Sequence, residues 1–258
     1  MPTILFASPI FGPVVSRRLG ISLGVNLLPA DGKLCNFDCI YCECGFNEER
    51  RPDSRMPSKT LVLTMLEDKL KVMEAKGELP DTITFAGNGE PTLHPDFPVI
   101  IDETIALRDK YAPKCNISVL TNATHIDRPK VFAALAKVDS PLLKLDTVDT
   151  DYIDEVDRPT SRYDLPKLIK CMKRLGRKAV IQTMFLHGVS NGKDVSNVSD
   201  KFVTPWFEVV KEIGPHLVTI YTIDRETPRH NLQKATKEEL DHIANRIREA
   251  GLEVTVSY

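Results

Sequence analysis

The sequence has no apolar run near the 18 or so residues that a membrane-spanning helix needs. Its opening residues are apolar, but they have no basic flank and are interrupted by Pro9 and Pro13. They lead into Arg17 and Arg18 rather than into a signal-peptidase cleavage site. We therefore expect neither a transmembrane helix nor a secretory signal, and we expect a cytoplasmic protein.

The chain also lacks a strong charge of either sign. It has 34 basic and 36 acidic residues, so its formal charge of −2 favours neither nucleic acid nor a membrane surface as a partner. A tRNA partner stays open, although the net charge does not support it. Six cysteines in 258 residues do not suggest a disulfide framework, because a chain of this length can build a large core. With no internal repeat and no clean linker, we expect one domain over residues 1–258 with a short N-terminal extension, residues 1–21.

Three cysteines are gathered in one short run. Cys35, Cys39 and Cys42 follow the spacing C-x3-C-x2-C, with Tyr41 directly before the last thiol. Three thiolates on a tight loop can hold a cubane of iron and sulfide by three of its four corners, which leaves the fourth iron open for another ligand. The spacing therefore predicts an iron–sulfur cluster with one reactive iron, held by these three cysteines.

Two other interpretations of the cysteines remain open. A structural zinc site needs four closed ligands, and here only Cys44 is near enough in sequence to be the fourth. No second C-x2-C pair or histidine pair follows at zinc-ribbon distance. The thiols could also be purely structural. We interpret Cys44, Cys115 and Cys171 as small buried or half-buried residues, with a redox or ligand role as the alternative for Cys44.

Apolar runs of strand length alternate with longer segments of helical period. Six such βα units in order predict an α/β fold with parallel strands and right-handed crossovers, and six rather than eight predict a partial, open (βα)6 barrel of the TIM type. The segment 188–200 is expected to be a mobile surface loop. The predicted strands are residues 22–28, 82–86, 117–120, 142–146, 179–185 and 217–221, with a last edge strand at 252–256. The predicted helices are residues 60–76, 97–110, 129–137, 165–175, 201–213 and 236–250.

Ligand sites in βα folds lie at the carboxyl ends of the strands, and the cysteine run follows the first predicted strand. A second motif, Gly87-Asn88-Gly89-Glu90, follows the second strand. Its glycines would let the backbone approach a ligand closely, and Glu90 offers a carboxylate to an ammonium group. The alternative is a glycine-rich turn with a surface acid.

These two motifs resemble those of the radical SAM superfamily, whose common G-G-E-P form differs here only in that Asn88 replaces the second glycine. The resemblance implies a 4Fe-4S cluster whose open iron binds the amine and carboxylate of S-adenosylmethionine. It implies that Tyr41 packs beside the cluster and adenine, and that the segment from Gly87 to Glu90 contacts the methionyl amino group. It also implies an electron donor such as flavodoxin or ferredoxin.

The activity that the resemblance implies is reductive cleavage of S-adenosylmethionine to methionine and a 5′-deoxyadenosyl radical, which abstracts hydrogen from a substrate in the barrel. Lys144 and Asp146 end the fourth strand, where the superfamily places contacts to the methionyl carboxylate or ribose. A plain ion pair between these two residues is the alternative. Further contacts to the cofactor are expected at other strand ends, from Asn122, Gln182 and Tyr221.

The substrate is less well specified. The segments 12–20, 156–159 and 224–228 resemble a branch whose nearest named relatives make wyosine bases in tRNA. Residues 1–34 contain no cysteine, whereas those tRNA enzymes carry a second set of cysteines ahead of the first, so the resemblance does not extend to a second cluster. We expect a small-molecule or nucleoside substrate, with an anionic group read by arginines at the barrel mouth, namely Arg17, Arg18, Arg158 and Arg225.

Two other functions fit the same motifs. An activase that installs a radical on a partner protein would need only a minimal barrel without further clusters. A non-catalytic protein could use the cysteine loop to bind an iron–sulfur cluster or zinc for structure alone. Genome neighbours would separate the two enzymatic alternatives, and a count of bound iron and sulfide would test the third.

The cysteine spacing makes a direct prediction. Replacing Cys35, Cys39 or Cys42 by alanine removes one of three cluster ligands, so each variant should lose the visible absorption of the reconstituted cluster. Cys44→Ala should keep it, because Cys44 lies outside the three-thiol motif. A Cys44→Ala protein that binds no cluster would show that the ligand set is wrong.

Overall fold

One curled sheet of eight strands organises the protein in this computed structural model, which describes residues 4–16 and 19–258. All neighbouring strands from β2 onward are parallel, and β1 alone runs antiparallel, beside β2. The predicted α/β fold, a partial, open barrel of parallel strands, is thereby confirmed, and β1 adds an antiparallel edge strand that the sequence patterns did not indicate. In spatial order the strands are β1 (Ile10–Ser16), β2 (Gly20–Val25), β3 (Thr82–Phe85), β4 (Asn116–Thr121), β5 (Ser140–Lys144), β6 (Val180–Met184), β9 (Leu217–Tyr221) and β11 (Glu253–Ser257).

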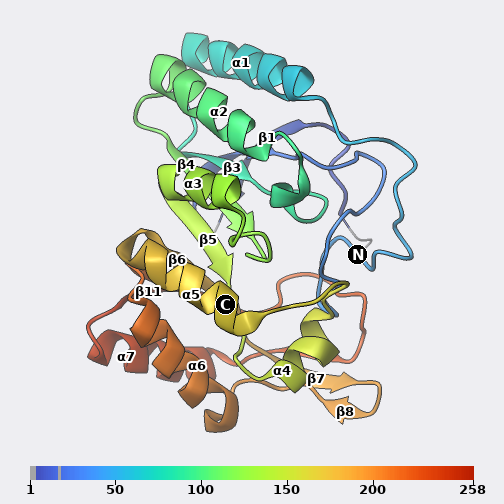
Figure 1. Ribbon diagram of the computed structural model, residues 1–258, viewed down its shortest axis with the longest axis vertical. Helices are drawn as coiled ribbons and strands as arrows, with labels where there is room; N and C mark the ends of the chain where they lie inside the picture. Colours follow the sequence, from blue (N-terminus) through green and yellow to red (C-terminus); the bar gives the residue numbers. More distant parts are fainter. Residues whose placement is uncertain (1–3, 17–18) are drawn as a thin grey trace.

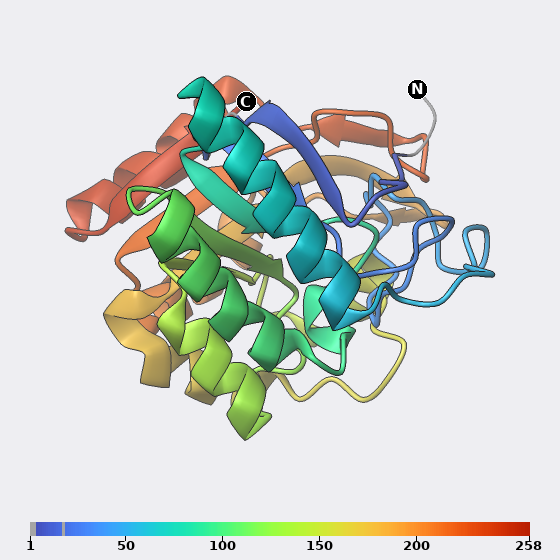
Figure 2. The same cartoon turned by 90° about the horizontal axis from the view of Figure 1, so that it is seen from above.

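The helices that connect the parallel strands lie along the outer face of this sheet, and the long segment between β2 and α1 lies on the opposite side (Figure 1). A view at right angles shows the same arrangement (Figure 2). No helix in the described part of the chain is both long and apolar enough to cross a membrane. The helices are α1 (Lys59–Lys76), η1 (Pro91–Leu93), α2 (Phe97–Tyr111), α3 (Pro129–Lys137), α4 (Thr150–Tyr152), η2 (Ile153–Asp157), α5 (Leu165–Leu175), η3 (Gly176–Lys178), α6 (Asp200–Ile213) and α7 (Lys237–Glu249).

Alternation along the strands separates an apolar outer face from a polar interior. In β3, Ile83 and Phe85 are fully buried in the main apolar core. The intervening Thr84 lines a cavity inside the barrel and shares a hydrogen bond of 2.8 Å with Ser22 of β2. Because successive side chains of a strand point to opposite faces, one short strand can supply both surfaces. The barrel therefore keeps hydroxyl groups inside, where a ligand could use them.

Local signals set the ends of α1. Ser58 precedes the helix and its side chain accepts a hydrogen bond from the Leu61 N–H, which is the usual N-cap arrangement. Gly77 ends the helix with φ of 69°, a left-handed conformation that glycine adopts without steric cost. Between these ends, Leu66 and Leu70 are buried against the sheet. The helix is thus positioned by its caps and held by its apolar face.

The structure adds a small sheet that the sequence patterns did not indicate. Its strands, in spatial order, are β10 (Leu232–Lys234), β7 (Leu186–Ser190) and β8 (Lys193–Asp194). The expectation of a loop over residues 188–200 was wrong for this part of the chain. The signal was weak because the strands are two to five residues long and β10 is remote in sequence.

A second, smaller apolar cluster connects this sheet to the cysteine segment. Ile40, which lies between the cysteines, is fully buried with Val156, Leu186, Val195 and Ile223. These residues come from the cysteine segment, η2, β7, the loop after β8 and the loop after β9. The small sheet therefore serves as the support on which the cysteine loop packs.

The main core predicts a large difference between two leucines of α1. Leu66 is fully buried, whereas Leu61 is 47% exposed on the same helix. Leu66→Ala should lower the free energy of unfolding by about 2 to 5 kcal/mol, because it removes apolar contacts and leaves a cavity. Leu61→Ala is the matched control and should change it by about 0.5 kcal/mol or less. Urea denaturation followed by circular dichroism would measure both, and equal losses would contradict the assigned packing.

Candidate active site

The cysteine segment between β2 and α1 is made of turns and isolated bridges, and backbone hydrogen bonds hold it from two sides. On one side Leu34 forms a parallel bridge with Gly89, and its carbonyl accepts a hydrogen bond of 3.1 Å from the Glu90 N–H. On the other side the Ile40 N–H donates to the Val156 carbonyl at 2.9 Å. The two predicted motifs are therefore joined directly through the main chain.

The three predicted cluster ligands are free thiols, and each is partly exposed. The Cys42 N–H donates to the Cys39 carbonyl at 3.1 Å, which closes a turn between two of them. Burial raises the pKa of Cys35 to about 12 and that of Cys39 well above its usual value. A hydrogen bond from Cys44 lowers the pKa of Cys42 to about 6, and Lys33 contributes to this effect. This turn keeps Cys39 and Cys42 on one short loop, which Cys35 begins.

This donor set suits an iron–sulfur cluster. Among the residues that the structure describes, no three Cys, His, Asp or Glu side chains converge closely enough to hold a single metal ion. The thiolates of a cubane each bind a different iron, so they need not converge on one point. Cys35, Cys39 and Cys42 would hold three of the four irons of such a cluster, and the protein would leave the fourth to another ligand.

The glycines of the second motif are required by close backbone contacts. Gly89 has φ of 135°, and a Cβ atom there would lie 1.9 Å from the Leu34 carbonyl oxygen. Gly87 has φ of 146°, and a Cβ atom there would lie 2.4 Å from the Asn26 side-chain oxygen. Side chains at either position would push the motif away from the cysteine segment. The two glycines therefore allow the glycine-rich motif to pack directly against the cysteine segment, in addition to any ligand contact.

Asn88, which replaces a glycine of the common motif, is completely buried. Its side-chain amide donates to the Pro29 carbonyl at 2.7 Å and to the Phe6 carbonyl at 3.0 Å. Its Oδ1 accepts a hydrogen bond of 2.8 Å from the Phe6 N–H. Asn88 therefore ties the N-terminal segment and the cysteine segment to the end of β3, and its predicted contact with the cofactor stays a prediction.

The Glu90 carboxylate is buried and accepts four hydrogen bonds. Its Oε1 accepts from the Thr92 N–H at 3.0 Å, the Thr92 hydroxyl at 2.5 Å and the Thr121 hydroxyl at 2.7 Å. Its Oε2 accepts from the Asn122 N–H at 2.7 Å. Burial raises the pKa of Glu90, although these hydrogen bonds act in the opposite direction. Because three of the four donors bind Oε1 and only one binds Oε2, Oε2 is the oxygen with room for a further donor, such as an ammonium group.

A buried charge network lies beside Cys39. Lys144 pairs with Asp146 and, at 2.9 Å, with Asp157, and the Tyr41 hydroxyl joins both Lys144 and Asp146. Burial opposes the charge of Lys144, but the two carboxylates outweigh it and hold its pKa well above the usual value. Burial raises the pKa of Asp157 to about 6. The structure therefore contains the inner ion pair between Lys144 and Asp146 that was the alternative to a ligand contact. Asp157 is a third member of this pair.

A cavity of about 410 Å³ lies inside the barrel, between the cysteine segment and the β1–β2 hairpin. Its walls combine the apolar side chains of Phe11, Val14 and Leu120 with the hydroxyl groups of Ser22 and Thr84. Two of the four clustered cysteines, Cys42 and Cys44, also line it. Of the predicted cofactor-binding residues, those on the cavity wall are Tyr41, Gly87 and Tyr221.

Other predicted cofactor residues are buried near the cavity but do not line it. The Asn122 side chain donates to the Asn36 side chain at 2.7 Å and to the Cys35 sulfur at 3.7 Å, so it lies beside the cluster loop. Gln182 is buried on β6, next in the sheet to Lys144 of β5. A ligand would reach these two residues only past the present wall of the cavity.

The predicted arginines do not gather at one place in the described residues. Arg17 and Arg18 lie outside the part of the chain that the structure describes. Arg158 is not a lining residue of the cavity; its guanidinium lies over the Phe46 ring at 4.9 Å and 3.6 Å from Asp38. Arg225 lines the cavity.

Arg225 forms an ion pair of 2.6 Å with Glu43, and both side chains are about half exposed. An anionic ligand at the mouth of the cavity would therefore have Arg225 as its one partner among the predicted arginines that the structure describes. Because an exposed ion pair contributes only about 0 to 1 kcal/mol, such a ligand could displace Glu43.

Two charged residues of the site were missed at the level of sequence. Asp157 is 118 residues from Cys39 in the chain, and only the fold brings the two side chains into contact. Lys33 lies two residues before Cys35, and its buried side chain interacts with the cysteines. The nearness of Lys33 to the motif was a usable signal, whereas nothing in the sequence marked Asp157 as a neighbour of the thiols.

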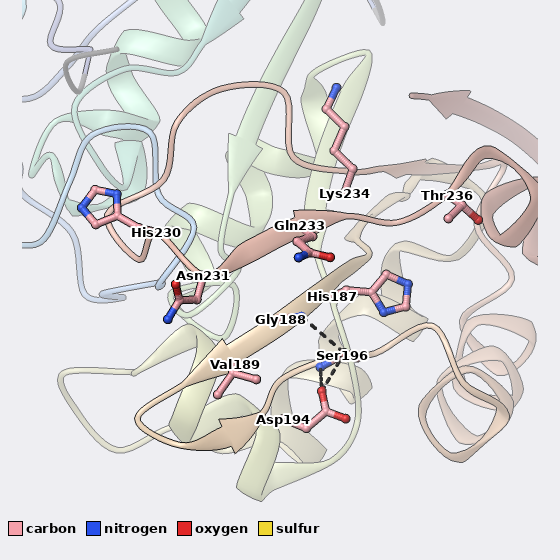
Figure 3. Close-up of a pocket in the computed structure, with 10 residues that line it drawn as sticks. All are labelled: His187, Gly188, Val189, Asp194, Ser196, His230, Asn231, Gln233, Lys234 and Thr236. Carbon is pink, nitrogen blue, oxygen red and sulfur yellow. Dashed lines mark hydrogen bonds between the residues drawn. The ribbon is translucent and has the colours of Figure 1, made fainter.

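A larger depression, of about 790 Å³, lies elsewhere, on the small sheet (Figure 3). His187 projects there from β7, but its ring contacts both carboxylate oxygens of Glu239, at 3.0 and 2.8 Å. The Asp194 carboxylate likewise accepts hydrogen bonds from Ser196, as the dashed lines in Figure 3 show. None of the cysteines lines this depression, so we place the chemistry in the smaller cavity.

The curled parallel sheet, with three thiols on the loop after its first parallel strand, defines an open βα barrel built around an iron–sulfur site. The sequence model of the Radical SAM superfamily matches residues 31–201, a region that includes both motifs. The chain belongs to the radical SAM superfamily, whose members are enzymes that bind a 4Fe-4S cluster and S-adenosylmethionine.

Similar proteins agree with this assignment. A UPF0026 protein of Helicobacter pylori is 31% identical over 220 residues, which cover 84% of this chain and 66% of the relative. The chain thus spans slightly less than two thirds of that relative. Among solved structures, a radical SAM methyltransferase from Sphaerobacter thermophilus gives a TM-score of 0.66 at 16% identity, covering 91% of this chain and 65% of the other. TYW1 with a bound lysine-pyruvate adduct gives 0.62 at 13%, covering 88% and 73%. These two likenesses show the shared fold.

The hydrogen bonds of Glu90 predict a structural effect of its removal. Glu90→Ala would leave the buried N–H groups of Thr92 and Asn122 without an acceptor, so the apo-protein should lose about 3 kcal/mol of unfolding free energy. Glu90→Gln keeps one acceptor oxygen and should lose less. Glu78→Ala, at an exposed position, is the control. Urea denaturation measures all three, and a Glu90→Ala protein as stable as the control would refute the assigned hydrogen bonds.

Proposed function

We propose that this protein is a radical SAM enzyme that cleaves S-adenosylmethionine reductively and uses the resulting 5′-deoxyadenosyl radical to abstract hydrogen from a substrate. The observation that carries this proposal is that the cluster loop and the glycine-rich motif border one cavity inside the barrel, through Cys42 and Gly87. When bound, the cluster would supply the electron and the cofactor the radical. The protein would supply binding, orientation and exclusion of water.

The residues of the cavity suit these roles. Tyr41 is held in place by Lys144 and Asp146, so the wall beside the cluster loop is rigid. Glu90 lies behind the cavity wall, at the end of the glycine-rich motif, and keeps one acceptor position for an ammonium group. The apolar side chains of Phe11 and Leu120 would help to exclude water from the space that holds the cofactor. These features support binding of the cofactor within the barrel.

The proposed substrate is a small molecule or a nucleoside. A cavity of about 410 Å³ is at the lower end of the size that holds a drug-sized ligand, so it would be filled largely by the cofactor. The substrate would then bind toward the mouth, near Glu43, Asp224 and Arg225. An anionic substrate would pair with Arg225 in place of Glu43. A flavodoxin or ferredoxin is the proposed electron donor.

Anaerobic reconstitution tests the proposal. The loaded protein should contain four iron and four sulfide per chain, and with a strong reductant it should convert S-adenosylmethionine into methionine and 5′-deoxyadenosine. Cys39→Ala should form neither product, because it lacks one cluster ligand. A wild-type protein with a full cluster that forms no 5′-deoxyadenosine with any reductant would contradict the proposed activity.

Filling the cavity should block the cofactor while the cluster is kept. Ala86 lines the cavity at the end of β3, so Ala86→Trp would place an indole ring in the space proposed for S-adenosylmethionine. The affinity measured by calorimetry on reconstituted protein should fall at least about tenfold, which corresponds to 1.4 kcal/mol. Ala75→Trp, at an exposed position of α1, is the matched control. Unchanged affinity in Ala86→Trp would move the cofactor out of this cavity.

A further inference from the structure

Lys33 carries a positive charge into the interior beside the cluster loop. Its side chain is 1% exposed, which makes it one of the most deeply buried charged groups in the described residues. Burial of an ammonium group is unfavourable unless polar partners compensate for the lost water. The Lys33 Nζ donates to the Gly45 carbonyl at 2.7 Å and lies 3.3 Å from the Asp38 carboxylate. Both partners belong to the cysteine segment itself.

The ammonium also faces the thiols. Its partner Gly45 donates its own N–H to the Cys42 carbonyl at 2.9 Å, and its partner Asp38 directly precedes Cys39. The ammonium therefore lies against the loop and interacts electrostatically with Cys42, Cys35 and Cys39. The Asp38 carboxylate is shared between Lys33 and a second donor, because it also accepts a hydrogen bond of 2.7 Å from the Asn47 N–H. Lys33 is therefore a fixed positive charge whose partners belong to the segment that carries the predicted cluster ligands.

We propose that Lys33 raises the reduction potential of the cluster by placing a buried positive charge against the cysteine loop. The inference rests on the proposed function, since it needs the cluster to accept an electron. Three thiolates already surround the cluster with negative charge, and reduction adds one more electron to it. A nearby ammonium stabilises that added charge.

Lys33 and Asp38 should have opposite effects on the reduction potential of the cluster. Removal of the Lys33 charge should make the cluster harder to reduce. Removal of the Asp38 charge should make it easier to reduce, because the negative group beside the ammonium is lost. A residue that only held the loop in shape would not produce two shifts of opposite sign, so the signs separate an electrostatic role from a structural one.

The experiment is a potentiometric titration of reconstituted holoprotein without S-adenosylmethionine, followed by the EPR signal of the reduced cluster. Lys33→Met keeps the length of the side chain and removes its charge. It should lower the equilibrium constant for one-electron reduction of the cluster at least tenfold, which corresponds to a fall of about 59 mV in the reduction potential. Asp38→Asn keeps an acceptor for the Asn47 N–H and should raise the potential. Lys114→Met, which removes the same charge from an exposed position, should leave it unchanged.

The measured potentials of the variants test the proposed role of Lys33. A Lys33→Met protein with a full cluster and the wild-type potential would overturn the inference, as would shifts of the same sign in Lys33→Met and Asp38→Asn. If Lys33→Met fails to load a full cluster, Asp38→Asn decides, and an unshifted or lowered potential there overturns the inference. A wild-type protein that takes up no four-iron cluster would overturn the proposed function as well, whereas unshifted potentials on intact clusters overturn this inference alone.

Discussion

The clamping of the cysteine segment by backbone hydrogen bonds is the constraint on which the site depends. Three sulfur atoms must keep fixed positions on a segment made of turns and isolated bridges, so its geometry must come from outside. The bridge from Leu34 to Gly89 supplies one side, and the hydrogen bond from Ile40 to Val156 supplies the other. Gly89 lies in the motif that follows β3, and Val156 lies in the helical turn η2, so the packed elements of the barrel fix the positions of the thiols.

Charge balance around the thiols follows from the same enclosure. Lys33 contacts Asp38 and Gly45, and Lys144 contacts Tyr41, so two buried ammonium groups lie against the cysteine segment. Each has an acidic partner, Asp38 for the first and Asp157 for the second. Buried charges are tolerated only where partners are close and well oriented, and here the partners also tie separate segments together. The same ion pairs therefore balance the buried charges and hold the folded segments of the site together.

The glycine-rich motif shows how one motif can have two roles. The sequence indicated a ligand contact for Asn88 and Glu90, but in the structure most of their polar atoms are used within the protein. Asn88 holds the N-terminal segment, and Glu90 joins the motif to the end of β4. Such internal bonds preorganise a site, because the groups that face a ligand are fixed before it binds. A contact with the cofactor is compatible with this role through the remaining acceptor position of Glu90.

The sequence by itself was enough to predict the barrel, which the structure confirms, and it predicts the cluster ligands. Strand and helix periodicities are local, and so is the spacing of Cys35, Cys39 and Cys42, so both could be read without a structure. Only the tertiary structure placed Asp157 beside Lys144, paired Arg225 with Glu43, and built the small sheet under Ile40. Each of these depends on contacts between segments far apart in the chain, and no local pattern records which distant groups a buried charge or a short strand will meet.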